Sequence, residues 1–353
     1  MQTTISESDV LNLINGLVLP RKSFDFTPNG DLPSDEKPPI TRREGIDDIV
    51  NALLSGREQK SNPEWVEALD RWWAREHAAT IIAFALLKER HGREYTPRYE
   101  DYLPGRHLMY KRLVDDAILS FMPDIKNRKV AEIGSGSGIS LTMLAREGAI
   151  AHAFDISETA LGFFKYLARQ SSVENRIRTK KGDFYQIDFS NDEFDLAYNV
   201  GVFEHRTPKE RIKLLEEMKR ITIPGGYIMI AVPNLISPHY KKMREREESI
   251  FQKFKQYMYP ERDFHDVDPR ELLTEAGLDV LKHDYVLIAP SAPIGRKVIH
   301  QEDYEFFMKL PNINGGNIPT AEKIKIWELL EARATPLQRQ RYGWFVYSIS
   351  RKS

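Results

Sequence analysis

The feature that most constrains the fold is a change in the hydrophobic pattern of the sequence at Lys129. From this point short runs rich in β-forming residues alternate with runs whose apolar residues recur at helical spacing. Such alternation is typical of a parallel sheet covered by helices on both faces. We expect strands near 129–133, 150–155, 177–182, 194–199, 227–232, 278–288 and 343–350. The sequence therefore predicts an α/β fold for this part of the chain.

In residues 1 to about 126 the apolar residues recur at helical spacing, and no strand pattern is present. A proline-rich loop, Leu19 to Thr41, interrupts the helical runs. We expect helices at Ser6 to Leu17, Ile46 to Leu54 and Pro63 to His91. Trp65, Trp72 and Trp73 in the last run are interpreted as helical core, with stacking on a substrate as the alternative. The predicted organisation is a helical N-terminal extension over residues 1–110 and a second domain over 111–353.

Two segments of the second domain do not fit the alternation, residues 235–267 and residues 291–342. The first follows the fifth strand. In an open α/β sheet the ligand sits outside the carboxyl ends of the strands. We therefore expect these insertions to cover the site.

A glycine loop follows the first expected strand, with Gly134, Gly136 and Gly138 spaced two residues apart after Glu132. Glycines let a backbone turn sharply and approach a ligand where a Cβ would collide. The dinucleotide fingerprint requires its third glycine at position 139, where this chain has Ile139. The loop therefore speaks against a nicotinamide cofactor.

Acidic or polar residues stand at the ends of the next three strands. Asp155, followed by Ile156, ends the second strand, and its carboxylate can accept hydrogen bonds from both hydroxyls of a ribose. Asp183 ends the third strand beside the aromatic ring of Phe184, and Asn199 ends the fourth. Taken singly, a tight turn or a helix cap explains each of these residues. Together they favour a site for an adenosine group.

Residues 129–288 resemble a class I S-adenosylmethionine-dependent methyltransferase of the small-molecule type, through the glycine loop, the acidic strand ends, Phe203-Glu204-His205 and Gly225-Gly226-Tyr227. The resemblance implies a seven-stranded Rossmann-like sheet in the order 3-2-1-4-5-7-6 with the last strand antiparallel. It implies S-adenosyl-L-methionine as cofactor. By this likeness the methionine part is lined by Glu132, Gly134, Ser135, Gly136 and Gly138, the ribose by Asp155, the adenine by Asp183 and Phe184, and the sulfonium by Asn199 and Gly201.

A helical segment just before the first strand adds two candidates. Arg106 can pair with the cofactor carboxylate, and Tyr110 can close over its methionine end. An exposed helix with solvated charges is an equally good interpretation of this segment.

Methyl transfer has no universal catalytic residue, because positioning of the acceptor supplies much of the rate. Candidate general bases are His205, Tyr240 and His265, with His239 beside Tyr240. His265 stands out because Asp263 or Asp266 can orient its imidazole. A polar loop before a helix is the competing explanation for this run.

Composition excludes several classes. With 51 Lys and Arg against 52 Asp and Glu, the net charge of −1 argues against a nucleic acid partner. The chain has no cysteine, which excludes disulfides, thiolate zinc sites and pyrimidine C5 methylation through a cysteine nucleophile. We expect no metal site. No secretory signal or membrane-spanning run is visible, so a cytoplasmic enzyme is the default expectation.

The acceptor expected from these exclusions is a small metabolite methylated on oxygen, nitrogen or carbon, of the natural-product or biosynthetic kind. Between residues 241 and 262 seven basic residues face four acidic ones, which suits an anionic acceptor, although a solvated helix face explains them more simply. A homodimer is left open. Two other functions remain as alternatives: a nicotinamide oxidoreductase, and a protein that binds S-adenosylmethionine without transferring its methyl group.

Overall fold

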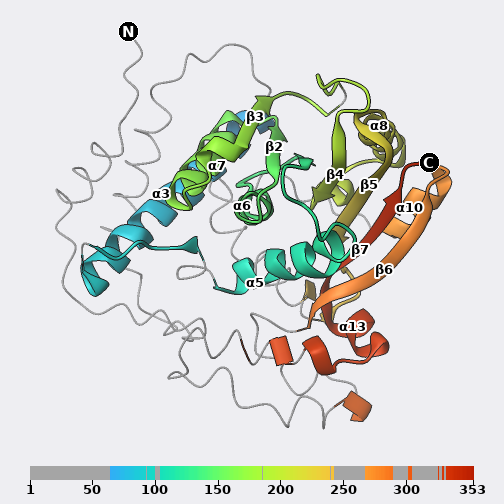
Figure 1. Cartoon of the computed structure of the whole chain (residues 1–353). Coiled ribbons are helices and arrows are strands. Elements are labelled where there is room, and N and C mark those ends of the chain that lie inside the picture. The colour runs from blue at the N-terminus through green and yellow to red at the C-terminus, as the bar shows by residue number, and fades with distance from the viewer. Residues whose placement is uncertain are drawn as a thin grey trace.

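The computed structural model describes residues 64–92, 94–99, 104–184, 186–238, 240–241, 267–288, 301–303, 325, 328–329 and 331–353. The expected helices at Ser6 to Leu17 and Ile46 to Leu54 lie outside these residues, as does most of both insertions. The described part is organised around one mixed sheet (Figure 1).

The sheet has seven strands in the order β3-β2-β1-β4-β5-β7-β6. The strands are β1 Lys129–Ile133, β2 Ile150–Asp155, β3 Ile177–Lys181, β4 Phe194–Val200, β5 Thr222–Pro233, β6 Asp279–Ile288 and β7 Gly343–Arg351. The first five run parallel, and β7 lies antiparallel between β5 and β6. Both the expected α/β class and the expected strand order are confirmed.

One strand is longer than the sequence predicted. The prediction placed the fifth strand at 227–232 because Gly225 and Gly226 indicate a turn, whereas β5 already begins at Thr222. The pairing of β5 with β4 shifts register between Phe194 and Leu196, so the glycines are absorbed as an irregularity within the strand. Gly226 permits this because an added Cβ would lie 2.8 Å from the side chain of Thr222.

Helices cover both faces of the sheet. The α-helices are α3 Glu64–His91, α5 Pro104–Leu113, α6 Ile139–Arg146, α7 Glu158–Gln170, α8 Pro208–Ile221, α10 Pro269–Glu275 and α13 Pro336–Tyr342. A π-helical turn, Val114–Leu119, continues α5, and short 3₁₀ turns occur at Glu174–Arg176, Phe203–His205 and Gln301–Asp303. Because successive strand residues point to opposite faces, Val130 joins the core under α6 and α7, and Ala131 joins the core under α8 and α10.

Helix starts follow the capping signals in the sequence. Thr207 and Glu210 form a capping box at the start of α8, and the Asp268 side chain accepts hydrogen bonds from the first backbone N–H groups of α10. Ser157 caps α7 by accepting from the N–H of Ala160 over 3.1 Å. These caps fix where α7, α8 and α10 leave the sheet.

The long helix α3 forms an outer layer beside α7 (Figure 1). Its apolar residues Ala74, Ala78, Ile81 and Phe84 recur at helical spacing and pack with Phe163 on α7. Burying a side chain as large as that of Ile81 or Phe84 contributes about 1.5–3 kcal/mol. The first part of the chain that the structure describes is therefore packed onto the α/β domain.

Candidate cofactor site

The glycine loop joins β1 to α6 at the carboxyl edge of the sheet. The backbone N–H groups of Gly134 and Ser135 donate to the carbonyl oxygen of Phe154 on β2, over 2.8 and 3.1 Å. Gly138 has a left-handed backbone with φ of 62°, and an added Cβ there would lie 2.3 Å from a ring carbon of Phe164. Only glycine fits this position, so the path of the loop is fixed by backbone geometry and packing.

Asp155 ends β2 and is buried. Its Oδ2 accepts a hydrogen bond from the N–H of Gly136 and its Oδ1 accepts one from the N–H of Ser157, both over 2.8 Å. Burial raises the pKa of Asp155 to about 6, while these two backbone donors oppose the rise. Since each carboxylate oxygen can accept a second hydrogen bond, ionised Asp155 offers two oriented acceptors, enough for a pair of hydroxyl groups.

Glu132 on β1 is buried beside the loop. Its Oε2 accepts hydrogen bonds from the hydroxyls of Ser140 (2.7 Å) and Tyr198 (3.0 Å). Burial raises the pKa of Glu132 to about 8, and the two hydroxyl donors lower it only in part. At neutral pH this carboxyl therefore holds a proton, which a cationic group placed beside it would displace.

Asn199 holds the end of β4 to the end of β1. Its amide nitrogen donates to the carbonyl oxygen of Ile133, and its side-chain oxygen accepts from the N–H of Val202 over 3.2 Å. The side chain of Val202 in turn lies against Gly134, where an added Cβ would come within 2.5 Å of it. Gly201 follows with a left-handed φ of 80°. Asn199 thus connects the ends of β1 and β4 by hydrogen bonds, and its place beside the sulfonium stays a prediction.

Two further candidates lie after β3. Asp183 is exposed, and Phe184 lies under the guanidinium of Arg206, whose carbon is 4.8 Å from the ring centroid. Ile156 directly follows Asp155 and is half-buried. The assignment of Asp183 and Phe184 to the adenine stays a prediction.

Arg106 and Tyr110 lie on α5. The guanidinium of Arg106 donates to Glu76 of α3 over 3.0 Å and to the hydroxyl of Tyr99 over 3.4 Å. Burial raises the pKa of Tyr110, and the charge of Glu132 adds to the rise. Arg106 thus already has Glu76 as an ionic partner, and the place of Tyr110 at the methionine end stays a prediction.

The structure places two of the three candidate bases. The imidazole Nε2 of His205 lies 3.8 Å from Oε1 of the buried Glu204. Tyr240 is buried, and its ring packs edge-on against Trp344 of β7 with centroids 5.8 Å apart. His265 lies outside the described residues, together with His239, Asp263 and Asp266. The catalytic roles of all three candidates stay predictions.

Sequence reasoning missed the contribution of α3 to this edge. Asp70 accepts hydrogen bonds from the Ser157 hydroxyl (2.5 Å) and from the N–H of Thr159 (3.2 Å). Trp73 lies against the glycine loop, where a Cβ on Gly136 would be 2.6 Å from its ring. The available signal was the three-residue spacing of Asp70 and Trp73, which places them on one side of a helix.

The loop also contains an unsatisfied polar atom. The hydroxyl of Ser135 is buried and has no hydrogen-bond partner within the parts of the chain that the structure describes. Buried hydroxyls are rarely left in this state without a ligand or water. With the acceptors of Asp155 and the buried carboxyl of Glu132 alongside, the residues fit a polar, cationic ligand that carries vicinal hydroxyls.

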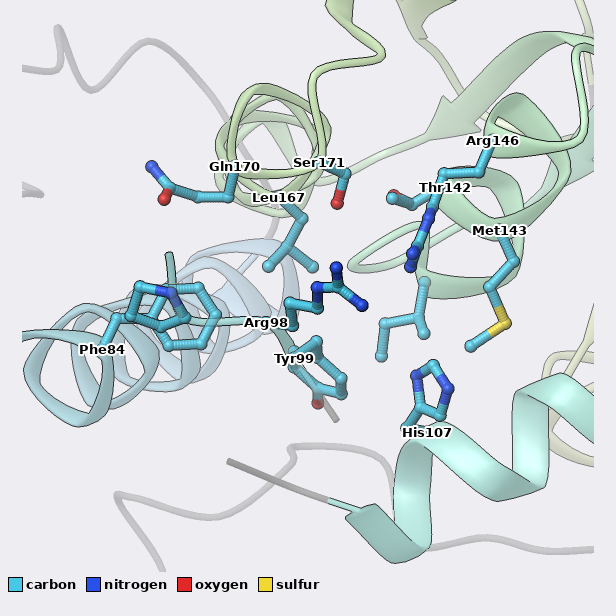
Figure 2. Close-up of a pocket in the computed structure, with 12 residues that line it drawn as sticks. Phe84, Arg98, Tyr99, His107, Thr142, Met143, Arg146, Leu167, Gln170 and Ser171 are labelled. Atoms are coloured by element: carbon cyan, nitrogen blue, oxygen red, sulfur yellow. The ribbon is translucent and has the colours of Figure 1, made fainter. Parts of the chain in front are cut away.

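A small pocket lies on the flank of α6, away from this edge (Figure 2). It runs from Ile139 at the start of α6 to Arg146 at its end, with α3, α5 and α7 as its other walls. Arg98, His107 and Arg146 point toward one another across it (Figure 2). This pocket is separate from the strand ends where the predicted cofactor residues gather.

The fold and loop together define a class. Residues 131–230 match a family model described as a methyltransferase domain. The strand order with an antiparallel β7 is that of the class I methyltransferase fold. Residues 131–230 therefore match a methyltransferase domain within a sheet of the class I order, and S-adenosylmethionine is the cofactor of that class.

Curated proteins resemble part of the chain. Ajmaline N-methyltransferase of Rauvolfia serpentina is 25% identical over 166 residues, which cover 45% of this chain and 56% of that protein. Demethylmenaquinone methyltransferase of Clavibacter sepedonicus is 30% identical over 106 residues, which cover 30% of this chain and 41% of that protein. The chain thus spans about half the length of the curated relatives it matches. A solved structure, a SAM-dependent methyltransferase from Archaeoglobus fulgidus, matches 70% of this chain and 94% of its own with a TM-score of 0.43 and 20% identity.

No helix in the described residues is both long and apolar enough to cross a membrane. Within the same residues, no group of three or more His, Asp or Glu side chains is arranged to hold a metal ion.

Proposed function

We propose that this protein is an S-adenosylmethionine-dependent methyltransferase that transfers a methyl group to an oxygen, nitrogen or carbon atom of a small metabolite. The domain supplies the cofactor chemistry, and residues 1–110 with the two insertions supply the acceptor pocket. A cytoplasmic location, a biosynthetic role and the option of a homodimer belong to the same proposal.

The observation that carries the proposal is the setting of Asp155. Its two oxygens are each held by one backbone N–H, from Gly136 and Ser157, so the carboxylate is oriented before any ligand arrives. Preorganised acceptors lose little freedom on binding, which favours affinity. In the proposal Asp155 accepts both ribose hydroxyls, while the backbone of Gly134 to Gly138 lies along the methionine part.

S-adenosylmethionine, when bound, supplies an electrophilic methyl group on a sulfonium sulfur. Glu132 receives the positively charged amino group of its methionine part and gives up its proton as it does so, since that charge favours the carboxylate. Asn199 keeps the ends of β1 and β4 together beside the sulfonium. The chain's main task is to hold the acceptor atom in line and exclude water.

Where the acceptor atom carries a proton that it must lose, a general base removes this proton and raises the rate about 10²–10⁴-fold. His265 is the proposed base, with His205 and Tyr240 as the other candidates. Two curated relatives are named ajmaline N-methyltransferase and demethylmenaquinone methyltransferase, which supports a small acceptor and leaves the acceptor atom open. An anionic acceptor stays an option because of the basic residues between 241 and 262.

The alternative is a methyltransferase-like protein that binds S-adenosylmethionine for a regulatory or non-methylating role. The two functions share every cofactor contact described above, so they differ only in product. Incubation with panels of small amines, phenols and carboxylic acids should release S-adenosylhomocysteine with at least one acceptor. Cofactor binding without this product across broad panels would favour the alternative.

A matched variant tests the assignment of Asp155. Asp155→Ala should abolish binding of S-adenosylmethionine while circular dichroism shows an unchanged fold, because both oriented acceptors are lost. Unchanged affinity of this variant would show that the ribose lies elsewhere.

A further inference from the structure

Helix α3 touches the predicted cofactor edge at three positions spaced three residues apart. Asp70 contacts the start of α7, Trp73 contacts the glycine loop, and Glu76 pairs with Arg106 on α5. Residues three apart on a helix lie on the same side of it. One side of α3 therefore follows the edge from Asp155 toward Tyr110.

The contact of Asp70 reaches Asp155 through one residue. Asp70 is buried and accepts from the Ser157 hydroxyl over 2.5 Å. The N–H of the same Ser157 donates to Oδ1 of Asp155 over 2.8 Å. Asp70 also accepts from the N–H of Thr159, so its charge lies at the positive N-terminal end of α7. Ser157 is thus held between two carboxylates.

The contact of Trp73 reaches Asp155 from the other side. Its ring packs against Gly136, close enough that a Cβ there would be 2.6 Å from a ring carbon. The N–H of Gly136 donates to Oδ2 of Asp155. The two residues whose backbone N–H groups donate to Asp155, Gly136 and Ser157, are therefore each contacted by a different side chain of α3.

We propose that α3 is a wall of the cofactor site, and that Asp70 and Trp73 are positioning residues that hold the two backbone donors of Asp155. This inference rests on the proposed function, because Asp155 is its link to the cofactor. It goes further in making cofactor affinity depend on the docking of α3, a helix outside residues 131–230. The hydroxyl of Thr159 lies at the same junction, buried and without a hydrogen-bond partner among the described residues.

A role in packing alone is the competing explanation, since α3 also buries Ala78 and Phe84 against α7 and its neighbours. Packing predicts that variants lower stability and leave the pH profile of cofactor binding in place. Positioning predicts a change of profile, because the charge of Asp70 on α3 raises the pKa of Asp155. Asp155 in turn raises the pKa of Glu132 on β1.

The decisive variant is Asp70→Asn, whose side-chain oxygen can still accept from Ser157 and Thr159. Removing the like charge lowers the pKa of Asp155, so Asp155 stays ionised to lower pH. The midpoint at which affinity for S-adenosylmethionine falls on acidification should move down by about half a unit or more. Glu89→Gln, the same change of charge at an exposed position near the end of α3, should leave the midpoint where it is.

Two truncations test the positioning itself by calorimetry at pH 8. Asp70→Ala and Trp73→Ala should each weaken binding of S-adenosylmethionine roughly tenfold, the effect of losing about 1.4 kcal/mol of support. Trp73→Phe should recover most of the affinity, because an aromatic ring remains on Gly136.

The outcomes separate the two proposals. Failure of the wild-type protein to bind S-adenosylmethionine refutes the proposed function. Binding by wild type, together with an unmoved Asp70→Asn midpoint and unchanged or tighter binding by Trp73→Ala, refutes the role of α3 alone. If either alanine variant does not fold, the midpoint of Asp70→Asn still decides the question: a midpoint shifted down supports the role of α3, and an unmoved midpoint refutes it.

Discussion

The buried carboxyl of Glu132 makes the stability of the protein depend on pH in a defined direction. The pKa of a glutamate is ordinarily near 4.5, and burial raises that of Glu132 to about 8. Between these two values the folded protein keeps a proton that the unfolded chain has lost. The free energy of unfolding therefore falls as pH rises from about 4.5 to 8, through this group.

The size of the effect follows from the interval. pH 7 lies 2.5 units above the ordinary pKa of 4.5, and the folded state keeps its proton over this whole interval. The free energy of unfolding is therefore lower at pH 7 by about 3 kcal/mol through this group. Glu132→Gln is neutral at every pH and keeps an oxygen that accepts from Ser140 and Tyr198. We therefore expect this variant to be more stable than wild type by about 3 kcal/mol at pH 7 and by less than ~1 kcal/mol at pH 5.

Urea unfolding at pH 5, 7 and 8, followed by circular dichroism, measures this difference. Exposed Glu216→Gln on α8 serves as control and should follow the wild type at each pH. The same Glu132→Gln variant should bind S-adenosylmethionine at least tenfold more weakly, because a charge-assisted contact is worth about 1.5–3 kcal/mol. A stability difference that stays constant from pH 5 to 8 would refute the assignment of a neutral, buried Glu132.

Other predictions concern the loop and the acceptor. Gly138→Ala should destabilise the protein by about 2–4 kcal/mol, because φ at this position is left-handed and the ring of Phe164 occupies the space of a Cβ. Gly162→Ala within α7 should stabilise the protein by about 0.5–1 kcal/mol, because an added Cβ there meets nothing within 4 Å. Thermal unfolding of both variants and the wild type measures the difference. Equal shifts for both would contradict the packing argument. His265→Ala should lower turnover far more than cofactor affinity, and wild-type turnover would return His265 to a loop role.

Much of the sheet could be predicted because its signals are local. Alternating strand and helix patterns gave seven strands, and caps such as Thr207 and Asp268 placed the helices between them. The start of β5 was missed because Gly225-Gly226 has the composition of a turn, and only the pairing with β4 shows that the strand accommodates it. Local sequence does not report such pairing.

The residues of α3 illustrate what local patterns cannot supply. From the sequence alone, Trp73 is an apolar residue of an amphipathic helix, and Asp70 is a polar residue of the same helix. Their partners Gly136 and Ser157 lie more than sixty residues away along the chain, so the contact depends on how α3 packs on the finished domain. By contrast, Asp155 could be singled out because its position at the end of a strand is itself a local signal.

Cofactor identity is the claim on which the account depends. Titration calorimetry of the wild-type protein with S-adenosylmethionine, and separately with NAD, tests it most directly at pH 8, where Asp155 is ionised. We predict saturable one-to-one binding of S-adenosylmethionine and no heat of binding with NAD. Binding of NAD, or of neither compound, would contradict the account.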